Sequence, residues 1–404
     1  MSIKVVIAGA GHAAGQAVAT LKQHKLDGNI VLVGDEAYLP YQRPPLSKKF
    51  LAGELPAERL AFRPASFYDD TQIDVRLSTP ISSIDRGGSC LRTADGSSIS
   101  YDKLIIALGT RARRLSIDGA DLAGVHYLRS IEDVNGIRAE IAANRKLVVV
   151  GAGYIGLEVA AVCRQQGVDV TVLELEDRVL SRVVSPQVSA FYEHEHAAQG
   201  VKLMLSTGLT TFRGEGRVES VDTDDGQSIP ADFVVVGVGV IPNTELAEAA
   251  GLDVNNGIVV DDQCRTSDPD IYAVGDCTSH PNSIYDRRLR LESVHNALEQ
   301  AKTAASNICG EEMHYSQVPW FWSDQYDLKL QIAGLSQGFD QIVLRGDPAT
   351  RSFACLYLEN GRLIAVDAIN APKDFIHSKA LIANNVRINT NKLADTGISL
   401  QDLA

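Results

Sequence analysis

The sequence contains few cysteines, and they are spread too widely for a metal or redox motif. None of Cys90, Cys163, Cys264, Cys277, Cys309 and Cys355 stands two to four residues from another. This spacing excludes zinc ribbons, closely spaced iron–sulfur ligands and the CxxC redox pair, so we expect no bound metal. We predict reduced and mostly buried thiols, which fits a reducing compartment.

Long apolar runs are absent as well. No run reaches the roughly 18 residues that a membrane helix needs, and no segment is of low complexity. The first strand-like run, 3–8, begins almost at Met1, which leaves no room for a secretory signal. We therefore expect a cytoplasmic protein that does not bind a membrane.

Basic residues are outnumbered by acidic ones. The 404 residues include 51 acidic and 38 basic side chains, for a net charge of −13. A chain this acidic repels a phosphate backbone, which disfavours nucleic-acid binding. The length favours two to three domains. Hydrophobic residues at 45% and charged residues at 22% are typical of globular rather than disordered proteins.

The sequence does contain a repeated glycine pattern. One apolar run leads into Gly9-Ala10-Gly11-His12-Ala13-Ala14, and a second leads into Gly151-Ala152-Gly153-Tyr154-Ile155-Gly156. In this GxGxx(G/A) pattern the first glycine permits a tight turn and the second lets the backbone approach a pyrophosphate. The third small residue lets the helix pack closely on the strand, and the helix N-terminus faces the phosphates. The pattern predicts two dinucleotide sites.

Each copy also has a second strand that runs into an acid about 20 residues further on. The run 29–34 leads to Asp35-Glu36, and the run 168–173 leads to Glu174. Such an acid accepts hydrogen bonds from a ribose diol. Two sites predict two dinucleotides, a bound FAD and a transient NAD(P)H. Glu174 favours NADH because a carboxylate repels a 2′-phosphate, while the nearby Arg178 leaves NADPH open.

The order of strand and helix patterns predicts an α/β fold with two Rossmann-like dinucleotide-binding domains and an α+β C-terminal domain. After Pro319 the pattern changes to four strand-like runs, an Asn360-Gly361 hairpin signal and a helical stretch at 372–385. The other predicted strands are 3–8, 30–34, 103–107, 233–236, 258–260 and 271–276, and the other predicted helices are 12–25 and 292–308. The C-terminal runs are 329–333, 341–345, 353–358 and 362–366.

Several longer motifs resemble those of a known family. They are Pro40 to Lys48 (PYQRPPLSK), Gly151 to Glu158, Thr266-Ser267-Asp268-Pro269, Gly275-Asp276-Cys277, Glu292-Ser293-Val294 and Pro319 to Gln325 (PWFWSDQ). With these residues the chain resembles, over essentially its whole length, the FAD-dependent NADH:ferredoxin reductases of bacterial oxygenase systems, the putidaredoxin reductase-like family. That family has the disulfide-reductase superfamily fold. The resemblance implies an FAD-binding domain in two segments, 1–111 and 244–320, an NADH-binding domain at 112–243, and a C-terminal domain at 321–404.

The resemblance also implies an activity. A hydride would pass from NADH to FAD, and electrons would then pass one at a time to an acidic [2Fe-2S] ferredoxin. The ferredoxin would serve a monooxygenase or a Rieske dioxygenase, for example in aromatic hydrocarbon catabolism. Residues 36–60 lack the redox cysteines of the superfamily's disulfide reductases and peroxidases, so we expect electrons to leave directly from the flavin. The alternatives are a rubredoxin reductase, an NADH oxidase and, less favoured, an apoptosis-inducing-factor-like interaction protein.

Three residues are the implied catalytic candidates. The resemblance places Lys48 beside the reactive edge of the isoalloxazine, where a cation stabilises negative charge on the reduced flavin. It pairs Glu158 with Lys48 and with the nicotinamide amide, although an acid in the first turn of a helix also suits the helix dipole. It places Trp322 near the flavin, although two tryptophans within three residues also fit a hydrophobic core.

The remaining candidates are cofactor contacts. Asp276 would bind a ribityl hydroxyl or cap a helix, the Val294 backbone N–H would face the flavin pyrimidine edge, and Arg129 would bind FAD or form a surface ion pair. The full FAD set is Gly9, Gly11, His12, Ala13, Ala14, Asp35, Arg43, Lys48, Ile81, Ala107, Gly109, Arg129, Gly275, Asp276 and Val294. The NADH set is Gly151, Gly153, Tyr154, Ile155, Gly156, Glu158, Glu174 and Gly239. At 107–110 the chain reads Ala-Leu-Gly-Thr where the superfamily often reads Ala-Thr-Gly, so one hydroxyl contact is lost.

A local basic cluster is the candidate docking surface. Arg287, Arg288 and Arg290 stand together in an otherwise acidic chain, and Lys48-Lys49 and Lys302 are candidates to extend the cluster. Such a patch steers an acidic ferredoxin toward its site, although most charge runs are simply solvated faces. We expect a monomer or a weak dimer.

Overall fold

The computed structural model describes residues 2–70 and 72–403, which fold into two compact units. The first unit comprises Met1–Arg43, Glu58–Arg111 and Ile241–Pro319. The second unit comprises Pro44–Ala57, Ala112–Val240 and Trp320–Ala404.

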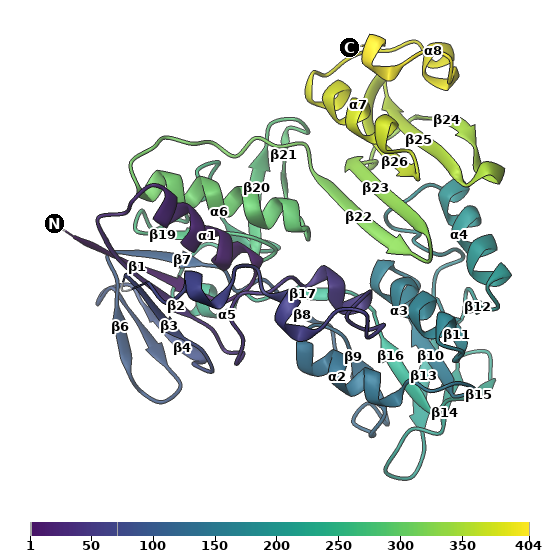
Figure 1. Ribbon diagram of the computed structural model, residues 1–404, viewed down its shortest axis with the longest axis horizontal. Coiled ribbons are helices and arrows are strands. Elements are labelled where there is room, and N and C mark those ends of the chain that lie inside the picture. Colours follow the sequence, from purple (N-terminus) through teal and green to yellow (C-terminus); the bar gives the residue numbers. More distant parts are fainter. Residues whose placement is uncertain (1, 71, 404) are drawn as a thin grey trace. The chain divides into compact units, whose positions relative to one another are not determined.

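The first unit is built on a five-stranded parallel sheet with the strand order β19-β7-β1-β2-β3 (Figure 1). Helices α1 and α6 pack against each other through small residues, including Ala17, Ala301 and Ala304, and cover one face of the sheet. The other face is covered by the antiparallel sheet β4-β5-β6, whose Ile84, Leu91 and Ile99 join the core of this face. Because both faces are covered, the strands are almost entirely apolar.

The elements of the first unit have the following bounds. The central strands are β1 (Ile3–Ala8), β2 (Gly28–Val33), β3 (Ile73–Arg76), β7 (Lys103–Ile106) and β19 (Ile271–Ala273). The others are α1 (His12–Gln23), η3 (Ala65–Phe67), β4 (Ile81–Asp85), β5 (Cys90–Thr93), β6 (Ser98–Ser100), α5 (Glu245–Ala249), β18 (Ile258–Val259), β20 (Thr278–Asn282), β21 (Arg287–Leu289) and α6 (Val294–Ile308). The short elements η2 (Ala57–Leu60), β8 (Thr110–Ala112) and β17 (Val240–Pro242) lie at the boundaries of the units.

The second unit contains another five-stranded parallel sheet, with the order β12-β11-β10-β16-β9. Each fingerprint therefore follows the central strand of a parallel sheet, and its second strand pairs alongside, as in a Rossmann fold. The elements up to Val240 are η1 (Pro44–Ser47), β9 (Val125–Tyr127), α2 (Ile131–Glu140), β10 (Lys146–Val150), α3 (Tyr154–Gln165), β11 (Asp169–Leu173), α4 (Pro186–Ala198), β12 (Lys202–Met204), β13 (Leu209–Arg213), β14 (Ser220–Thr223), β15 (Ser228–Pro230) and β16 (Phe233–Val236).

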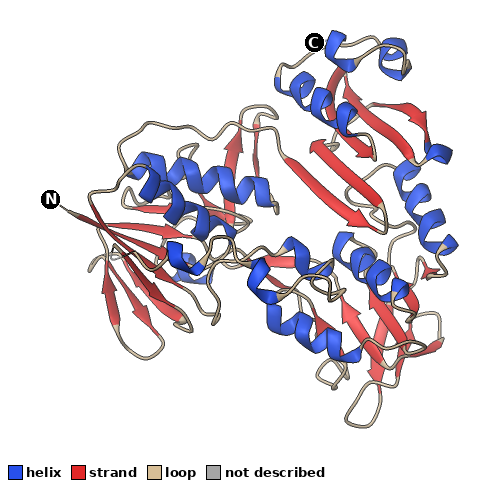
Figure 2. Cartoon of the chain, viewed as in Figure 1, coloured by secondary structure: helices blue, strands red, loops and turns tan. Residues whose placement is uncertain are grey.

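The C-terminal part of the second unit is a five-stranded antiparallel sheet with the order β22-β23-β26-β25-β24, shown red in Figure 2. Asn360 and Gly361 connect β25 to β26 with φ values of +53° and +76°, as the hairpin signal predicts. Helix α7 packs on β23 and β26. The elements are β22 (Trp320–Gln325), β23 (Leu328–Gly334), β24 (Gln341–Asp347), η4 (Pro348–Thr350), β25 (Ser352–Glu359), β26 (Arg362–Ile369), α7 (Pro372–Ala383), α8 (Thr390–Ala394) and η5 (Leu400–Leu403).

The segment 44–57 departs from the expected division of the chain. The expected first segment, 1–111, includes these residues, but in the structure they pack with the second unit. The reason is a set of polar contacts: Ser47 and Lys48 bond Glu158, and Gln166 Nε2 donates to the Ala52 carbonyl at 3.2 Å.

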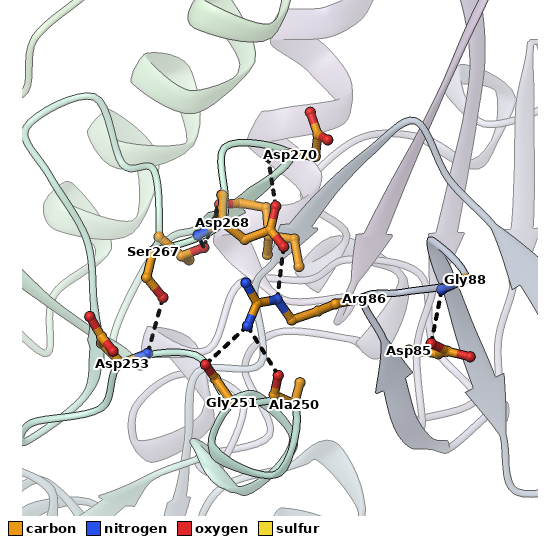
Figure 3. Close-up of polar contacts among 11 residues, drawn as sticks. Asp85, Arg86, Gly88, Ala250, Gly251, Asp253, Ser267, Asp268 and Asp270 are labelled. Carbon is orange, nitrogen blue, oxygen red and sulfur yellow. Dashed lines mark hydrogen bonds and ion pairs between the residues drawn. The ribbon is translucent and has the colours of Figure 1, made fainter.

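The Thr266–Pro269 motif has a structural role within the first unit. Arg86, which follows β4, donates from Nε to Asp268 Oδ2 at 2.8 Å and from Nη1 to the Gly251 carbonyl at 3.1 Å (Figure 3). Ser267 Oγ accepts from the Asp253 backbone N–H at 3.3 Å. These contacts tie the β4–β6 sheet, the residues after α5 and the motif together.

Among the described residues, no helix is both long enough and apolar enough to cross a membrane.

Candidate functional site

The first fingerprint forms a tight turn followed by an open helix start. Gly9 has φ +114°, and a Cβ there would lie 2.3 Å from the Ala107 carbonyl oxygen, so no side chain fits. A Cβ on Gly11 would meet no atom within 4 Å. Gly11 caps α1 without any side-chain hydrogen bond, which leaves the first N–H groups of the helix available to a ligand.

The second fingerprint has the same geometry. Gly151 has φ +102°, and a Cβ there would lie 2.5 Å from the Gly237 carbonyl oxygen. A Cβ on Gly156 would lie 2.0 Å from the Gly151 carbonyl oxygen, whereas Gly153 faces open space and caps α3 without a side chain. Ile155, in the first turn, leaves 39% of its surface exposed. Both copies thus have the turn, the open second glycine and the uncapped helix that a pyrophosphate requires.

The two acids occupy different registers. Glu174 directly follows Leu173, and its carboxylate accepts from the Ala152 backbone N–H at 2.6 Å and the Glu176 backbone N–H at 3.0 Å. In the first copy Val33 pairs with Ala8 as Leu173 pairs with Val150, so the matching position is Gly34. Asp35 therefore stands one residue later, where it is exposed and accepts from the Glu36 backbone N–H at 3.0 Å.

The contacts of Glu36 with Arg43 and Tyr41 were not predicted from the sequence. Arg43 Nη2 donates to Glu36 Oε1 at 2.6 Å, and the Tyr41 hydroxyl donates to Glu36 Oε2 at 2.7 Å. Burial alone lowers the pKa of Arg43, but the charges of Tyr41, Glu36 and Asp276 outweigh it, and the net effect raises that pKa. The sequence did offer one signal for this ion pair, because Arg43, the basic residue of the PYQR motif, stands seven positions after Glu36.

The other FAD candidates of the first unit gather where its parallel strands end. Gly9 follows β1, Ala107 and Gly109 follow β7, and Gly275 and Asp276 follow β19. The carboxyl ends of parallel strands are where dinucleotides bind in such sheets. Gly275 approaches the fingerprint closely, since a Cβ there would lie 3.4 Å from Ala13 Cβ.

Asp276 is held by contacts that the sequence did not indicate. It lies between β19 and β20 and caps no helix. Thr110 Oγ1 donates to Asp276 Oδ2 at 3.5 Å. The chain lacks the threonine that the superfamily often has at position 108, but it has this hydroxyl two residues later. Gln300, also missed, accepts from the Gly275 backbone N–H at 2.7 Å. Val294 is the first residue of α6, and Ile81 begins β4.

In the second unit Lys48 and Glu158 form a buried ion pair. Lys48 Nζ lies 2.7 Å from Glu158 Oε2, and Ser47 Oγ donates to the same oxygen at 2.5 Å. Ser323 Oγ donates to Glu158 Oε1 at 2.6 Å. Burial raises the pKa of Glu158, which is 2% exposed, and Lys48 and the two serines act against that rise. The serines went unnoticed in the sequence, although Ser47 precedes Lys48 and Ser323 follows Trp322.

One expectation about Glu158 is wrong. It is the fifth residue of α3, not a first-turn residue, and that first turn contains no acid. The helix dipole falls off within one turn, so it does not account for the position of this carboxylate. The ion pair does.

Strand β22 presents different side chains on its two faces. Trp320 and Trp322 share one face, with ring centroids 5.5 Å apart, and Trp320 also packs against Phe375 of α7. Phe321 and Ser323 share the other face, where the Phe321 ring lies 4.7 Å from that of Tyr154. Trp320 and Trp322 are both half-buried.

Arg129 and Gly239 also belong to the second unit. Arg129 precedes the N-cap Ser130 of α2, and its backbone N–H donates to Asp133 at 3.0 Å. Gly239 has φ +95° and faces open space. The structure therefore places most FAD candidates in the first unit, and Lys48, Arg129, Trp322 and the NADH candidates in the second.

The basic cluster is partly neutralised within the first unit. Arg288 donates to the Val260 and Ser279 carbonyls at 2.6 and 2.5 Å. Arg290 pairs with Glu292 at 2.5 Å and is only 16% exposed. Arg287 is exposed, with its guanidinium 5.9 Å from the centre of the Tyr285 ring. Arg287 and Arg288 are both exposed, whereas Arg290 is half-buried.

Comparison with protein families identifies the family in which this arrangement occurs. Residues 3–301 match the family model described as pyridine nucleotide-disulphide oxidoreductase, and residues 320–404 match the model described as reductase C-terminal. The chain belongs to the pyridine nucleotide-disulphide oxidoreductases. The predicted fold, with two Rossmann-like domains and an α+β C-terminal domain, is confirmed.

Curated relatives of this oxidoreductase cover nearly its whole length. It is 43% identical over 401 residues to the 5,5′-dehydrodivanillate O-demethylase ferredoxin reductase subunit of a Sphingobium species, covering 98% of the chain and 97% of the relative. It is 42% identical over 370 residues to the rubredoxin-NAD(+) reductase of Pseudomonas putida, covering 91% and 96%.

A solved structure is similar throughout. The crystal structure of the covalent putidaredoxin reductase–putidaredoxin complex contains a chain that matches with a TM-score of 0.97 at 42% identity, covering 99% of this chain and 98% of that one. The predicted resemblance is therefore confirmed. Members of this oxidoreductase family use FAD and NAD(H). The open second glycines and uncapped helices of both fingerprints fit these two dinucleotides.

Proposed function

We propose that this oxidoreductase is an FAD-dependent NADH:ferredoxin reductase that serves an oxygenase system. The observation that carries the proposal is the pair of uncapped dinucleotide fingerprints in one chain that lacks a reactive thiol pair. The Sphingobium relative, named as a ferredoxin reductase subunit of an O-demethylase, supports it. We also propose FAD-binding segments at 1–111 and 244–320, NADH binding at 112–243 and a C-terminal domain at 321–404, in a cytoplasmic monomer or weak dimer.

The residues of the first unit would hold FAD. The backbone from Gly9 to Ala14 would contact the pyrophosphate, Asp35 the adenosine ribose, Asp276 a ribityl hydroxyl and the Val294 N–H the pyrimidine edge. When bound, FAD supplies the redox chemistry by accepting a hydride and releasing electrons one at a time. The protein contributes positions and charges, with Lys48 stabilising negative charge and Glu158 holding Lys48.

NADH is the favoured donor because the nearby arginine is engaged elsewhere. Arg178 Nη1 donates to the Val184 carbonyl at 2.9 Å and to Ser189 Oγ at 2.7 Å, and Nη2 donates to the Ser181 carbonyl at 2.6 Å. Glu174 would accept from the ribose diol and repel a 2′-phosphate. Glu174→Ala should raise the NADPH-to-NADH ratio of kcat/KM by about tenfold, equivalent to about 1.4 kcal/mol. An unchanged ratio would remove Glu174 from the coenzyme site.

The acceptor distinguishes the main alternatives. A rubredoxin remains a second candidate because the Pseudomonas putida rubredoxin reductase is 42% identical over 370 residues. An NADH oxidase would deliver electrons to oxygen, and a DNA-binding protein conflicts with the net charge of −13.

One experiment tests the proposal. The purified holoprotein should lose its flavin absorbance on anaerobic addition of NADH and recover it on addition of an oxidised [2Fe-2S] ferredoxin. A panel of ferredoxins, a rubredoxin and oxygen, assayed at equal ionic strength, compares the acceptors. If turnover is fastest with rubredoxin or with oxygen, the protein is a rubredoxin reductase or an NADH oxidase instead. A purified protein that binds no flavin would refute the proposal.

A further inference from the structure

A polar chain extends from the Lys48–Glu158 pair into the C-terminal part of the second unit. Ser323 Oγ donates to Glu158 Oε1 at 2.6 Å, while Lys48 and Ser47 occupy the other carboxylate oxygen. Ser323 is fully buried and comes from β22, more than 150 positions from Glu158 in the sequence. A hydroxyl that donates to a carboxylate favours the ionised form of that carboxylate.

The serine hydroxyl is itself oriented by buried neighbours. Gln325 Nε2 donates to Ser323 Oγ at 3.3 Å, which directs the serine proton toward Glu158. Gln325 Oε1 then faces His196 Nε2 of α4 at 2.8 Å, and the Tyr326 hydroxyl lies 3.2 Å from His196 Nδ1. This arrangement fits a neutral imidazole that carries its proton on Nε2 and accepts from Tyr326 on Nδ1.

Burial agrees with that protonation state. His196 is 0% exposed and Gln325 is 1% exposed. Burial lowers the pKa of His196, although the bond to Gln325 and the charge of Glu195 act in the other direction. The imidazole therefore stays neutral at neutral pH and keeps Gln325 in the orientation that serves Ser323.

We propose that Ser323, oriented by Gln325 and His196, is a positioning residue that keeps the Glu158 carboxylate ionised and directed toward Lys48. The C-terminal part of the chain would thereby contribute to the oxidation of NADH as well as to the transfer of electrons to the acceptor protein. The inference rests on the proposed role of the Lys48–Glu158 pair. Because a hydrogen bond to a charged group typically changes an equilibrium by tenfold or more, its loss should raise the pKa of Glu158 by about one unit.

The other ionisable groups near Glu158 do not obscure this test. Lys48 faces it from the 44–57 segment, Tyr154 from its own helix and Tyr192 from α4. Burial raises the pKa of both phenols far above 10, so they remain neutral across the working range.

Infrared spectroscopy of the holoprotein reads the state of Glu158 directly. The C=O stretch of its protonated carboxyl, assigned by its loss in Glu158→Gln, is followed against pH. Ser323→Ala should raise the midpoint by about one pH unit, and Ser323→Thr, which keeps the hydroxyl, should restore the wild-type midpoint. If Ser323→Ala does not fold, Gln325→Met, which releases the serine hydroxyl, must show a smaller shift in the same direction. An unchanged midpoint in both variants overturns the inference.

Stopped-flow reduction by NADH adds a second readout. Ser323→Ala should slow flavin reduction about tenfold with its acid limb moved to higher pH, and should have less than a twofold further effect in a Glu158→Gln background. An equal loss in both backgrounds would show that Ser323 acts otherwise than through Glu158. If Glu158→Gln reduces the flavin at the wild-type rate, the proposed role of the ion pair fails, while the infrared midpoint still decides the role of Ser323.

Discussion

Glu158 shows how much a single buried charge depends on its neighbours. Its side chain is almost inaccessible to water, and both carboxylate oxygens are nevertheless occupied by donors from two other segments. Removing one partner of a buried pair is costly because the remaining charge is left without compensation. The consequences for stability and for chemistry can therefore be separated by substituting each partner in turn.

Lys48→Met should destabilise the protein by about 3–5 kcal/mol and slow flavin reduction by NADH at least tenfold. The variant leaves the buried carboxylate of Glu158 without its cation, which favours protonation of that group. Urea unfolding and stopped-flow absorbance measure the two effects. The double variant Lys48→Met/Glu158→Gln should regain most of the stability but not the rate. Equal stability of the wild type and Lys48→Met would contradict the energetic role of the pair.

Asp367 makes the stability of the second unit depend on pH. It is 1% exposed, burial raises its pKa to about 7, and the hydrogen bond that it accepts from the Tyr357 hydroxyl only partly opposes this rise. Since the folded form holds its proton more tightly than the unfolded form, the stabilisation is present below about pH 4 and is lost as the pH rises to 7.

Asp367→Asn should therefore flatten the fall in stability between pH 5 and pH 8, because the amide stays neutral. Chemical denaturation across this range measures the change. Asp225→Asn is the matched control, because hydrogen bonds from Thr223 and Gln227 lower the pKa of this exposed carboxyl out of that range. A slope unchanged in Asp367→Asn would show that the carboxyl titrates elsewhere.

Among the elements, the β4–β6 sheet is attached to the rest of the first unit by one arginine in addition to its apolar core residues. Arg86 joins it to Asp268 and to the residues after α5 (Figure 3). Burial of Asp268 favours its neutral form, but the bonds from Arg86 and from the Asp270 backbone outweigh this and lower its pKa. The stabilisation is present at neutral pH and is lost as the pH falls through the acid range.

Asp268→Ala should destabilise the first unit by about 1–3 kcal/mol and increase hydrogen exchange in β4 and β5. Asp74→Ala, which breaks the exposed pair with Arg76, should cost less than about 1 kcal/mol. Hydrogen exchange followed by mass spectrometry measures both variants. Similar exchange in both would mean that Arg86 does not hold the sheet.

The order and type of these elements could be predicted from the sequence because they depend on local pattern. The apolar runs before each fingerprint, the alternating runs after Pro319 and the Asn360-Gly361 turn all identify structure within a few residues of themselves. The contacts of Ser323 with Glu158 and of Gln300 with Gly275 could not be predicted this way. They join segments far apart in the chain, and a serine or glutamine carries no local signal for its partner.

For the whole molecule, the net charge of −13 sets the background on which the docking cluster acts. Within that cluster Arg288 donates to backbone carbonyls, which leaves its charge in place, while Arg290 pairs with the carboxylate of Glu292. We propose that the exposed Arg287 and Arg288 contribute to the electrostatic attraction to an acidic ferredoxin.

Arg287→Glu should lower the rate of ferredoxin reduction about tenfold at low salt and weaken its dependence on ionic strength. Flavin reduction by NADH should not change. Arg213→Glu, which reverses an exposed charge in the second unit, is the control and should have a small effect. Equal salt dependence in the wild type and Arg287→Glu would rule out this docking surface.

The thiols of the folded protein should be dispensable for turnover. Cys90, Cys163, Cys264, Cys277 and Cys355 are buried, and burial raises the pKa of both Cys277 and Cys355 to about 11. Reactive thiolates are therefore scarce at neutral pH. Treatment of the native holoprotein with iodoacetamide should leave ferredoxin reduction intact, while the unfolded chain should take up six labels. Inactivation that parallels the labelling of one cysteine would demand a thiol relay.

The two faces of β22 have a consequence for protein engineering. A graft of residues 320–404 from a homologue, made to exchange the electron acceptor, replaces Ser323 and Gln325 together with the tryptophans. On the proposed role of Ser323, such a chimera should change its rate of NADH oxidation along with its choice of protein partner. We therefore expect successful grafts to retain Ser323 and Gln325 of the recipient.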